Sequence, residues 1–180
     1  LPIRLAAAAG VHRVHVLAWR DLDDVEGGGS ELHIHEMARR WAAAQATLDR
    51  ARPGVAAQAV GLAQGALDWA MRYTSERQQF GQSVMSFQYT QFRLADMATE
   101  IEAARQLVYG AARYIDEGHP GASKYAAMCK VFATDVAMRV TTDAVQVFGG
   151  YGYVEDFPVE RYMREAKVLQ IVEGTNQVQR

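Results

Sequence analysis

The feature that most constrains this chain is a helical spacing of apolar residues that recurs in three long stretches. Residues 55–76 carry apolar side chains three or four positions apart, and the same spacing returns over residues 87–116 and 123–148. Apolar residues at this spacing form one stripe along a helix, which must be buried against a neighbour. Short connections between long helices make those neighbours antiparallel. The sequence therefore predicts an all-α fold, an antiparallel up-and-down helical bundle.

Glycine and proline indicate where these helices begin and end. Gly118 predicts the end of the second helix and the pair Gly149–Gly150 the end of the third, because glycine takes the left-handed backbone of a helix C-terminus. Ser123 is the predicted N-cap of the third helix. Pro53 leaves two readings open, since proline either opens a helix in its first turn or kinks a longer helix that begins near Glu36.

The N-terminal part of the chain has a different character. We expect residues 1–40 to form an irregular segment, with a short strand over residues 11–17, and residues 41–180 to form the bundle domain. Two close histidine pairs occur in this segment: His12 with His15, and His33 with His35. A metal site needs a defined ligand set and supporting carboxylates, so this spacing alone predicts no metal site.

Bulk properties exclude several classes of protein. A formal net charge of −2 gives no general attraction to nucleic acid or to an anionic membrane. No apolar run approaches the ~18 residues that a spanning helix needs, so we expect no membrane span. The single cysteine, Cys129, excludes an internal disulfide and is expected to be buried packing rather than a nucleophile. We expect a cytoplasmic protein, or one of the mitochondrial matrix if the source is eukaryotic.

One carboxylate and one glycine turn are candidates for chemistry. Glu173 stands between an apolar run and the turn at Gly174, where a carboxylate with apolar neighbours suits general-base catalysis and glycine lets a ligand approach closely. The alternative is an ordinary glutamate at a helix end. The segment QVFGG at 146–150 brings bare backbone close to a flat cofactor or a diphosphate, or else is a plain helix end. Arg77 either binds phosphate oxygens or complements a helix dipole.

The order of these segments is more specific than any one of them. LDRARPG (48–54), ERQQFGQSVMSFQ (76–88), DAVQVFGGYGYVEDFPVER (143–161) and VLQIVEGTNQVQR (168–180) occur in one chain at ordered distances. Together they closely resemble the C-terminal domain of acyl-CoA dehydrogenases over about residues 41–180.

The resemblance implies roles for individual residues. Glu173 would be the catalytic base, and Asp49, Arg52 and Gly174 would contact the acyl-CoA substrate. The residues expected to bind FAD are Arg77, Phe80 and Gln88 across a subunit boundary, and Gln146, Val147, Phe148, Gly149 and Gly150 at the same flavin. Thr175 and Gln177 would bind FAD in the subunit that carries the base. Relatives of the isovaleryl and long-chain branch carry their base at a site that is Ala51 here, which assigns the base to Glu173.

The resemblance also implies a reaction and its partners. The enzyme would dehydrogenate acyl-CoA thioesters to trans-2-enoyl-CoA, as a homo-oligomer (dimer or tetramer) that passes electrons to an electron-transfer flavoprotein. The family's other domains are not recognisable here, so we expect a piece of the full enzyme. The alternative is a non-catalytic helical bundle that acts in oligomerisation or partner binding.

Overall fold

The structure, a computed structural model, describes residues 31–180, with side chains for residues 39, 40, 42–44 and 46–180. The strand expected over residues 11–17 and the histidines His12 and His15 lie outside the described residues, as do the side chains of His33 and His35. The described chain forms two compact units, divided between Ala51 and Arg52. The domain boundary near residue 40 stays a prediction.

Helix α2 (Glu31–Glu76) crosses the division between the units and decides the question that Pro53 left open. The helix begins at Glu31, ahead of the expected Glu36, and continues past Pro53 to Glu76. Pro53 therefore lies inside a long helix rather than at its start. Proline removes one backbone hydrogen bond there, which the packing of the surrounding turns must offset.

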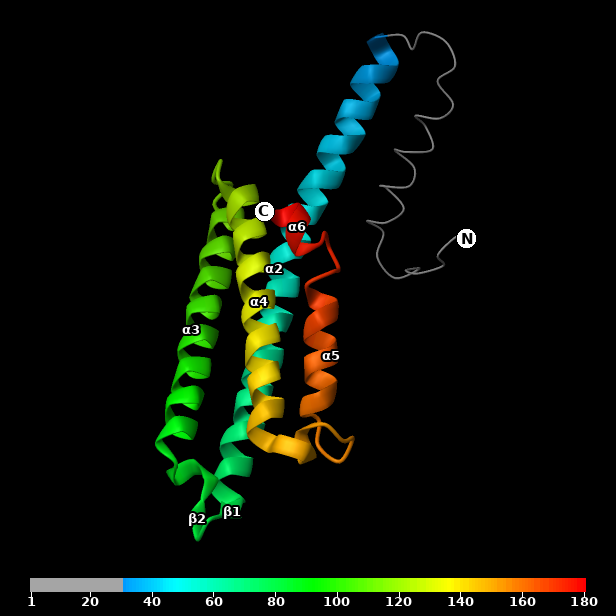
Figure 1. The fold of residues 1–180 in the computed structure, drawn as a ribbon. Coiled ribbons are helices and arrows are strands. Elements are labelled where there is room, and N and C mark those ends of the chain that lie inside the picture. Colours follow the sequence, from blue (N-terminus) through cyan, green and yellow to red (C-terminus); the bar gives the residue numbers. More distant parts are fainter. Residues whose placement is uncertain (1–30) are drawn as a thin grey trace, which may run out of the picture. The chain divides into compact units, whose positions relative to one another are not determined.

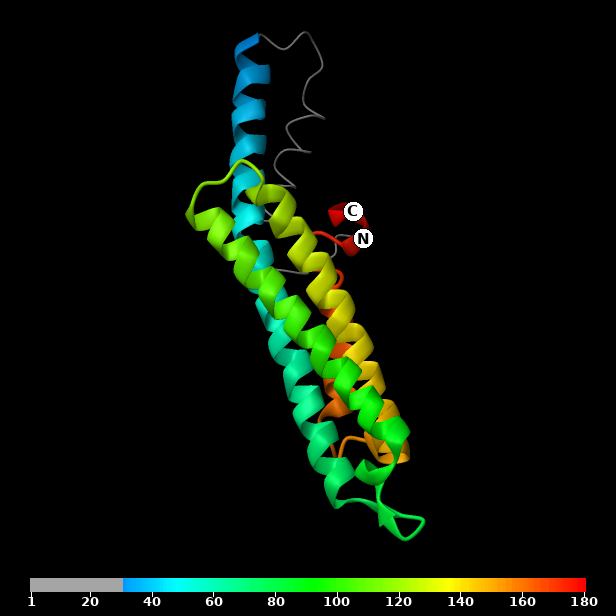
Figure 2. The same cartoon turned by 90° about the vertical axis from the view of Figure 1, so that its left-hand side faces the viewer.

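The three longest further helices of the second unit are α3 (Gln88–Asp116), α4 (Ala122–Phe148) and α5 (Val159–Leu169). The green α3 runs beside the yellow α4 in both views (Figures 1 and 2). With α2 from Ala56 onward they bury one apolar core, whose members include Leu67, Ile101 and Val136. The all-α bundle is confirmed, and Cys129 is fully buried in its core.

Two of the predicted helix ends lie at glycines, as expected. Gly118 and Gly149 both have a φ of 62°, the left-handed conformation expected after α3 and at the end of α4. The N-cap of α4 is Gly121, so the prediction of Ser123 was wrong; Ser123 lies inside the first turn. Between α2 and α3 the chain forms a short hairpin of two antiparallel strands, β1 (Gln78–Gln79) and β2 (Gln82–Ser83), with two residues in each strand.

Two short helical turns position the residues of interest. The 3₁₀ turn η2 (Gly149–Gly152) continues from the end of α4, and a second 3₁₀ turn, η1 (Val84–Ser86), leads from the hairpin into α3. Helix α6 (Asn176–Gln179) ends the chain beside α4. Within residues 31–180, no helix is both long enough and apolar enough to cross a lipid bilayer.

Candidate functional site

Glu173 lies in the loop between α5 and α6, in a conformation that few side chains adopt. Its φ is 55° and that of Gly174 is 86°, so two successive residues have left-handed backbone. A residue with a Cβ atom costs about 1–2 kcal/mol in this region, and such outliers gather at functional sites. The carboxyl atom Oε2 of Glu173 is buried and has no hydrogen-bond partner among residues 31–180. The loop therefore holds an unpaired acceptor in a strained turn.

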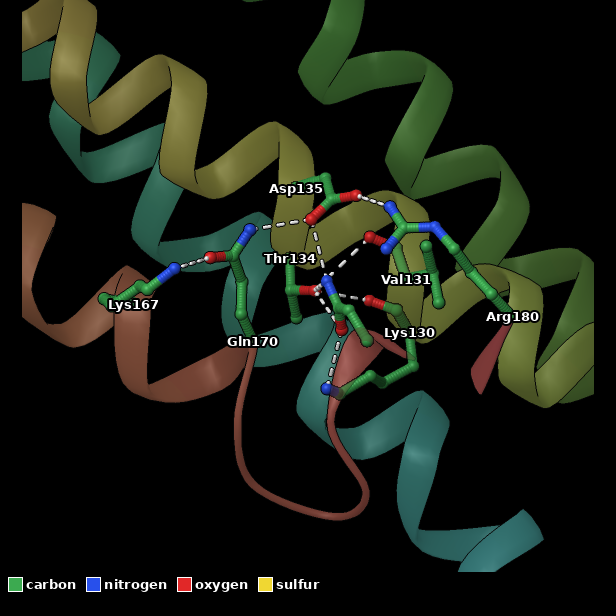
Figure 3. A network of polar contacts seen from close by, with 8 residues as sticks. Lys130, Val131, Thr134, Asp135, Lys167, Gln170 and Arg180 are labelled. Carbon is green, nitrogen blue, oxygen red and sulfur yellow. Dashed lines mark hydrogen bonds and ion pairs between the residues drawn. The ribbon is translucent and has the colours of Figure 1, made fainter. Parts of the chain in front are cut away.

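Lys130, which lies on α4, fixes this turn through hydrogen bonds. Its Nζ atom donates to the carbonyl of Gly174 at 2.9 Å and to Oδ1 of Asn176 at 2.8 Å. Figure 3 shows the lysine reaching from α4 towards the loop. Gln179 adds two bonds from the other side, from Nε2 to the carbonyls of Glu173 (3.1 Å) and Gly174 (3.3 Å). All four of these hydrogen bonds are accepted by backbone carbonyls of the turn or by Asn176, so none of them uses the carboxyl group of Glu173.

A second layer of polar contacts holds Asn176 against α4, and Figure 3 labels its partners Thr134 and Asp135. Its Nδ2 donates to Oδ1 of Asp135 at 2.7 Å and to Oγ1 of Thr134 at 2.9 Å. Asp135 also accepts from Nε2 of Gln170 at 2.7 Å and from Arg180 at 2.7 Å. The carboxylate of Asp135 thus ties both ends of the loop to the middle of α4.

The charge of Lys130 is unusually placed, because the side chain is wholly buried. Burial lowers the pKa of Lys130 from 10.5 to about 8, and the positive charge of Arg52 acts in the same direction. The negative charges of Asp135 and Glu173 act in the opposite direction. A buried ammonium with two oxygen partners therefore stands behind the Glu173 turn.

A separate hollow of about 630 Å³ opens at the far end of α4. We name it the QVFGG hollow; its lining comprises Tyr73, Arg77, Gln79, Val84, Gln146, Val147, Phe148, Gly149, Gly150, Tyr151, Val154 and Asp156. Six residues predicted to bind FAD are among them: Arg77 and the whole segment 146–150. The structure thus brings together two sequence segments that lie about 70 residues apart.

The chemistry of this hollow suits a flat, charged ligand. The Arg77 guanidinium stands 5.5 Å from the ring centre of Tyr151, and the rings of Tyr73 and Phe148 are stacked 4.0 Å apart. Nothing lies within 4 Å of where a Cβ atom would stand on Gly149 or Gly150, so their backbone is open to a ligand. A planar donor fork, the exposed ring of Tyr151 and bare peptide groups are features that a flat, anionic ligand can contact.

The hairpin supplies the other predicted flavin contacts, Phe80 and Gln88. Phe80 is 91% exposed at the tip, with a φ of 53°, and meets Phe87 edge-on at 6.3 Å. Gln88 is the exposed first residue of α3. Neither lines the QVFGG hollow, whereas their neighbours Gln79 and Val84 do. An aromatic side chain this exposed is free to contact another molecule.

The remaining predicted residues lie elsewhere. Thr175 is the N-cap of α6, where its Oγ1 accepts from the Val178 amide, and Gln177 is exposed on the same helix. Arg52 is buried in the second unit, and Asp49 is half-buried in the first. All of these roles stay predictions.

The predicted site thus falls into two groups within one chain. About 24 Å of helix separates Lys130, behind the Glu173 turn, from Gln146 at the QVFGG hollow, taking 1.5 Å per residue. Figure 1 shows α6 and the η2 turn beside opposite ends of α4. No side chain spans that distance, so one chain cannot bring Glu173 and the QVFGG hollow against the same small group.

Sequence reasoning missed the residues that hold the turn: Lys130, Thr134, Asp135 and Asn176. A signal was available for one of them. Lys130 occupies the apolar stripe of α4, four residues after Ala126 and three before Ala133, both of which are buried. A lysine at such a position must either reach out of the core or find a buried partner.

Comparison with known proteins agrees with the fold and the motif order. The family model described as "Acyl-CoA dehydrogenase, C-terminal domain" matches residues 24–180. The chain belongs to the acyl-CoA dehydrogenase family. Its match covers the QVFGG hollow and the Glu173 turn together, whereas residues 24–30 of the match lie outside the described part of the chain.

Individual relatives are similar over most of this chain. A protein named probable acyl-CoA dehydrogenase FadE25, from Mycobacterium tuberculosis, is 58% identical over 82% of the chain. The Caffeyl-CoA reductase-Etf complex subunit CarC of Acetobacterium woodii is 46% identical over 83% of it. The solved structure of butyryl-CoA dehydrogenase from Megasphaera elsdenii superposes with a TM-score of 0.73 at 57% identity, over 75% of this chain.

The chain is shorter than these relatives. It spans 38% of the length of FadE25, 39% of CarC and 35% of the butyryl-CoA dehydrogenase chain. Both candidate groups lie in the part of the chain that matches the family's C-terminal domain.

Among residues 31–180, no group of three or more His, Cys, Asp or Glu side chains is arranged to hold a metal ion.

Proposed function

We propose that this chain is the helical domain of an FAD-dependent acyl-CoA dehydrogenase, in which Glu173 removes the α-proton of an acyl-CoA thioester. The observation that carries the proposal is the buried Oε2 of Glu173, which has no hydrogen-bond partner among residues 31–180. A general base needs a free acceptor at a fixed position, and the surrounding bonds fix the turn without using that carboxyl group. The product would be trans-2-enoyl-CoA.

The residues of the QVFGG hollow fit FAD and would hold it. Arg77 offers a charged donor fork, Gly149 and Gly150 offer open backbone, and Gln146 offers a side-chain amide. When bound, FAD accepts the β-hydrogen of the substrate as a hydride. Thr175 and Gln177, on the other side of the Glu173 turn, would complete the contacts from a second copy of the chain.

Substrate and partners follow from the relatives. The short-chain specific acyl-CoA dehydrogenase of Megasphaera elsdenii, 53% identical over 83% of this chain, supports a short acyl-CoA substrate, with Asp49 and Arg52 among its contacts. The name of CarC supports an electron-transfer flavoprotein as the electron acceptor. The separation of the two groups along α4 supports a homo-oligomer, a dimer or tetramer. We also propose a cytoplasmic location, or the mitochondrial matrix in a eukaryote.

Two variants test the proposal. In the full-length protein loaded with FAD, Glu173→Gln keeps the shape of the side chain but removes the base, so dehydrogenation of butanoyl-CoA is expected to stop while flavin stays bound. Glu165→Gln, an exposed glutamate paired with Arg161 on α5, is the control and is expected to keep wild-type activity. A wild-type rate for Glu173→Gln would refute the assignment of the base.

Arg77→Ala tests the flavin contact. Loss of one charged hydrogen bond is expected to weaken FAD binding by about 1.5–3 kcal/mol, measured by fluorescence titration. Arg72→Ala, five residues earlier in the last turns of α2 and paired with Glu76 at the surface, is the matched control. Equal FAD affinity of the two variants would remove Arg77 from the site. If the wild-type protein shows no visible flavin absorbance after loading, a non-catalytic bundle is favoured instead.

A further inference from the structure

Lys130 is the most buried charged side chain whose partners the structure defines. Its exposed fraction is 0%, and it lies on the buried face of α4 between Ala126 and Ala133. Lysine is rarely buried without a partner, because its charged form loses hydration. Replacing buried ion pairs by apolar residues is often neutral or stabilising, so stability alone does not explain this lysine.

The two bonds of Lys130 go to the turn that carries the strain. Its Nζ atom reaches the carbonyl of Gly174 at 2.9 Å and Oδ1 of Asn176 at 2.8 Å, and neither partner is on α4. Gly174 and Glu173 are the successive residues with φ of 86° and 55°. The ammonium of Lys130 binds the Gly174 carbonyl. This bond opposes relaxation of the turn to an ordinary backbone conformation.

The lysine does not bind the carboxyl group itself. Both hydrogen-bond partners of Nζ are oxygens, one of the Gly174 backbone and one of the Asn176 side chain, while Oε2 of Glu173 has no partner among residues 31–180. A direct ion pair would stabilise the charged form of the carboxylate and weaken it as a base. The arrangement therefore fixes where the carboxyl group stands and leaves its oxygen available.

We propose that Lys130 is a positioning residue for the reaction, which fixes the Glu173–Gly174 turn through the Gly174 carbonyl and the Asn176 amide. The proposal rests on the proposed role of Glu173 as the base. Lys130 touches neither substrate nor flavin in this scheme and acts only through the turn. Asn176 relays the restraint, because it joins Lys130 to Thr134 and Asp135.

The first experiment needs neither flavin nor substrate. Lys130→Met keeps the length of the side chain and removes its charge and donors; Lys124→Met, an exposed lysine earlier on α4, is the control. Backbone NMR of the whole chain is expected to show large shifts for the amides of Glu173 and Gly174 in Lys130→Met and none in Lys124→Met. Unchanged Glu173 and Gly174 signals in a folded Lys130→Met chain would overturn the proposal.

The second experiment measures the reaction in the FAD-loaded full-length protein. Lys130→Met is expected to lower kcat at least tenfold with KM changed less than threefold, because a displaced base slows the chemical step more than it weakens binding. A wild-type kcat in Lys130→Met, beside an inactive Glu173→Gln, would overturn the positioning role while leaving the base assigned. A wild-type kcat in Glu173→Gln would overturn both.

Asn176→Ala keeps the test decisive if Lys130→Met does not fold. This variant removes the relay but retains the bond from Lys130 to the Gly174 carbonyl. We expect smaller shifts of the same two amides and a kcat lowered severalfold. A folded Asn176→Ala protein with unchanged amide signals and unchanged kcat would overturn the proposal.

Discussion

Gly152 is the glycine whose substitution the structure penalises most clearly. It is buried in η2, and a Cβ atom there would stand 2.6 Å from the carbonyl oxygen of Val145, 2.7 Å from Cβ of Phe148 and 3.0 Å from Cα of Val145. These are atoms of the last turn of α4, which no rotamer change can move. Gly152→Ala must therefore displace η2 from α4, and overpacking of this kind costs about 1–3 kcal/mol.

Thermal unfolding followed by circular dichroism measures this cost. For a unit of this size 1 kcal/mol corresponds to roughly 3–5 °C, so a cost near 2 kcal/mol lowers Tm by about 6–10 °C. Gly150→Ala, two residues earlier, is the control, because nothing lies within 4 Å of its added Cβ atom; its Tm is expected to stay within about 2 °C of wild type. Equal Tm values for the two variants would refute the steric reasoning.

Three further predictions concern the same bundle. Gly61→Ala, at an open position inside α2, should raise the free energy of unfolding in urea by about 0.5–1 kcal/mol. Cys129 is buried and its pKa is raised to about 12, so at pH 8 the native chain should not react with a thiol reagent that modifies it fully in guanidinium. Because the pKa of Lys130 falls from 10.5 unfolded to about 8 folded, the unfolded chain binds more protons between these values. The free energy of unfolding of the wild type should therefore rise by up to about 3 kcal/mol, relative to that of Lys130→Met, as pH rises from 8 to 10.5. An equal pH dependence of both chains in urea unfolding would contradict this.

The helices could be predicted because their signals are local. Gly118 and Gly149 ended α3 and α4 as expected, since the left-handed backbone at a helix end favours glycine wherever the helix lies. Ser123 was chosen as a cap because hydroxyl side chains favour that position, yet the N-cap of α4 lies two residues earlier, at Gly121. Pro53 was ambiguous for the same reason: whether a helix continues through proline is decided by packing, which a local pattern does not contain.

The network behind Glu173 could not be read in the same way. Lys130 lies 44 residues from Gly174 in the sequence, and nothing near either residue predicts that their atoms meet. The hairpin at residues 78–83 was missed as well, because two residues per strand are too few to show an alternating pattern. Contacts of this kind depend on how α4, α5 and the last loop are arranged together.

The arrangement along α4 explains why one sequence shows two separate groups of candidate residues. The QVFGG hollow belongs to the last turn of α4, and the Glu173 turn is tied to Lys130 and Asp135, about 24 Å back along the same helix. A helix is too stiff to fold these groups together, and a glutamate side chain reaches only a few ångströms. If the flavin ring itself lay in the QVFGG hollow, the hollow and the Glu173 carboxyl could act on one substrate only from different copies of the chain. This agrees with the subunit boundary that the family resemblance implies between Arg77 and the base.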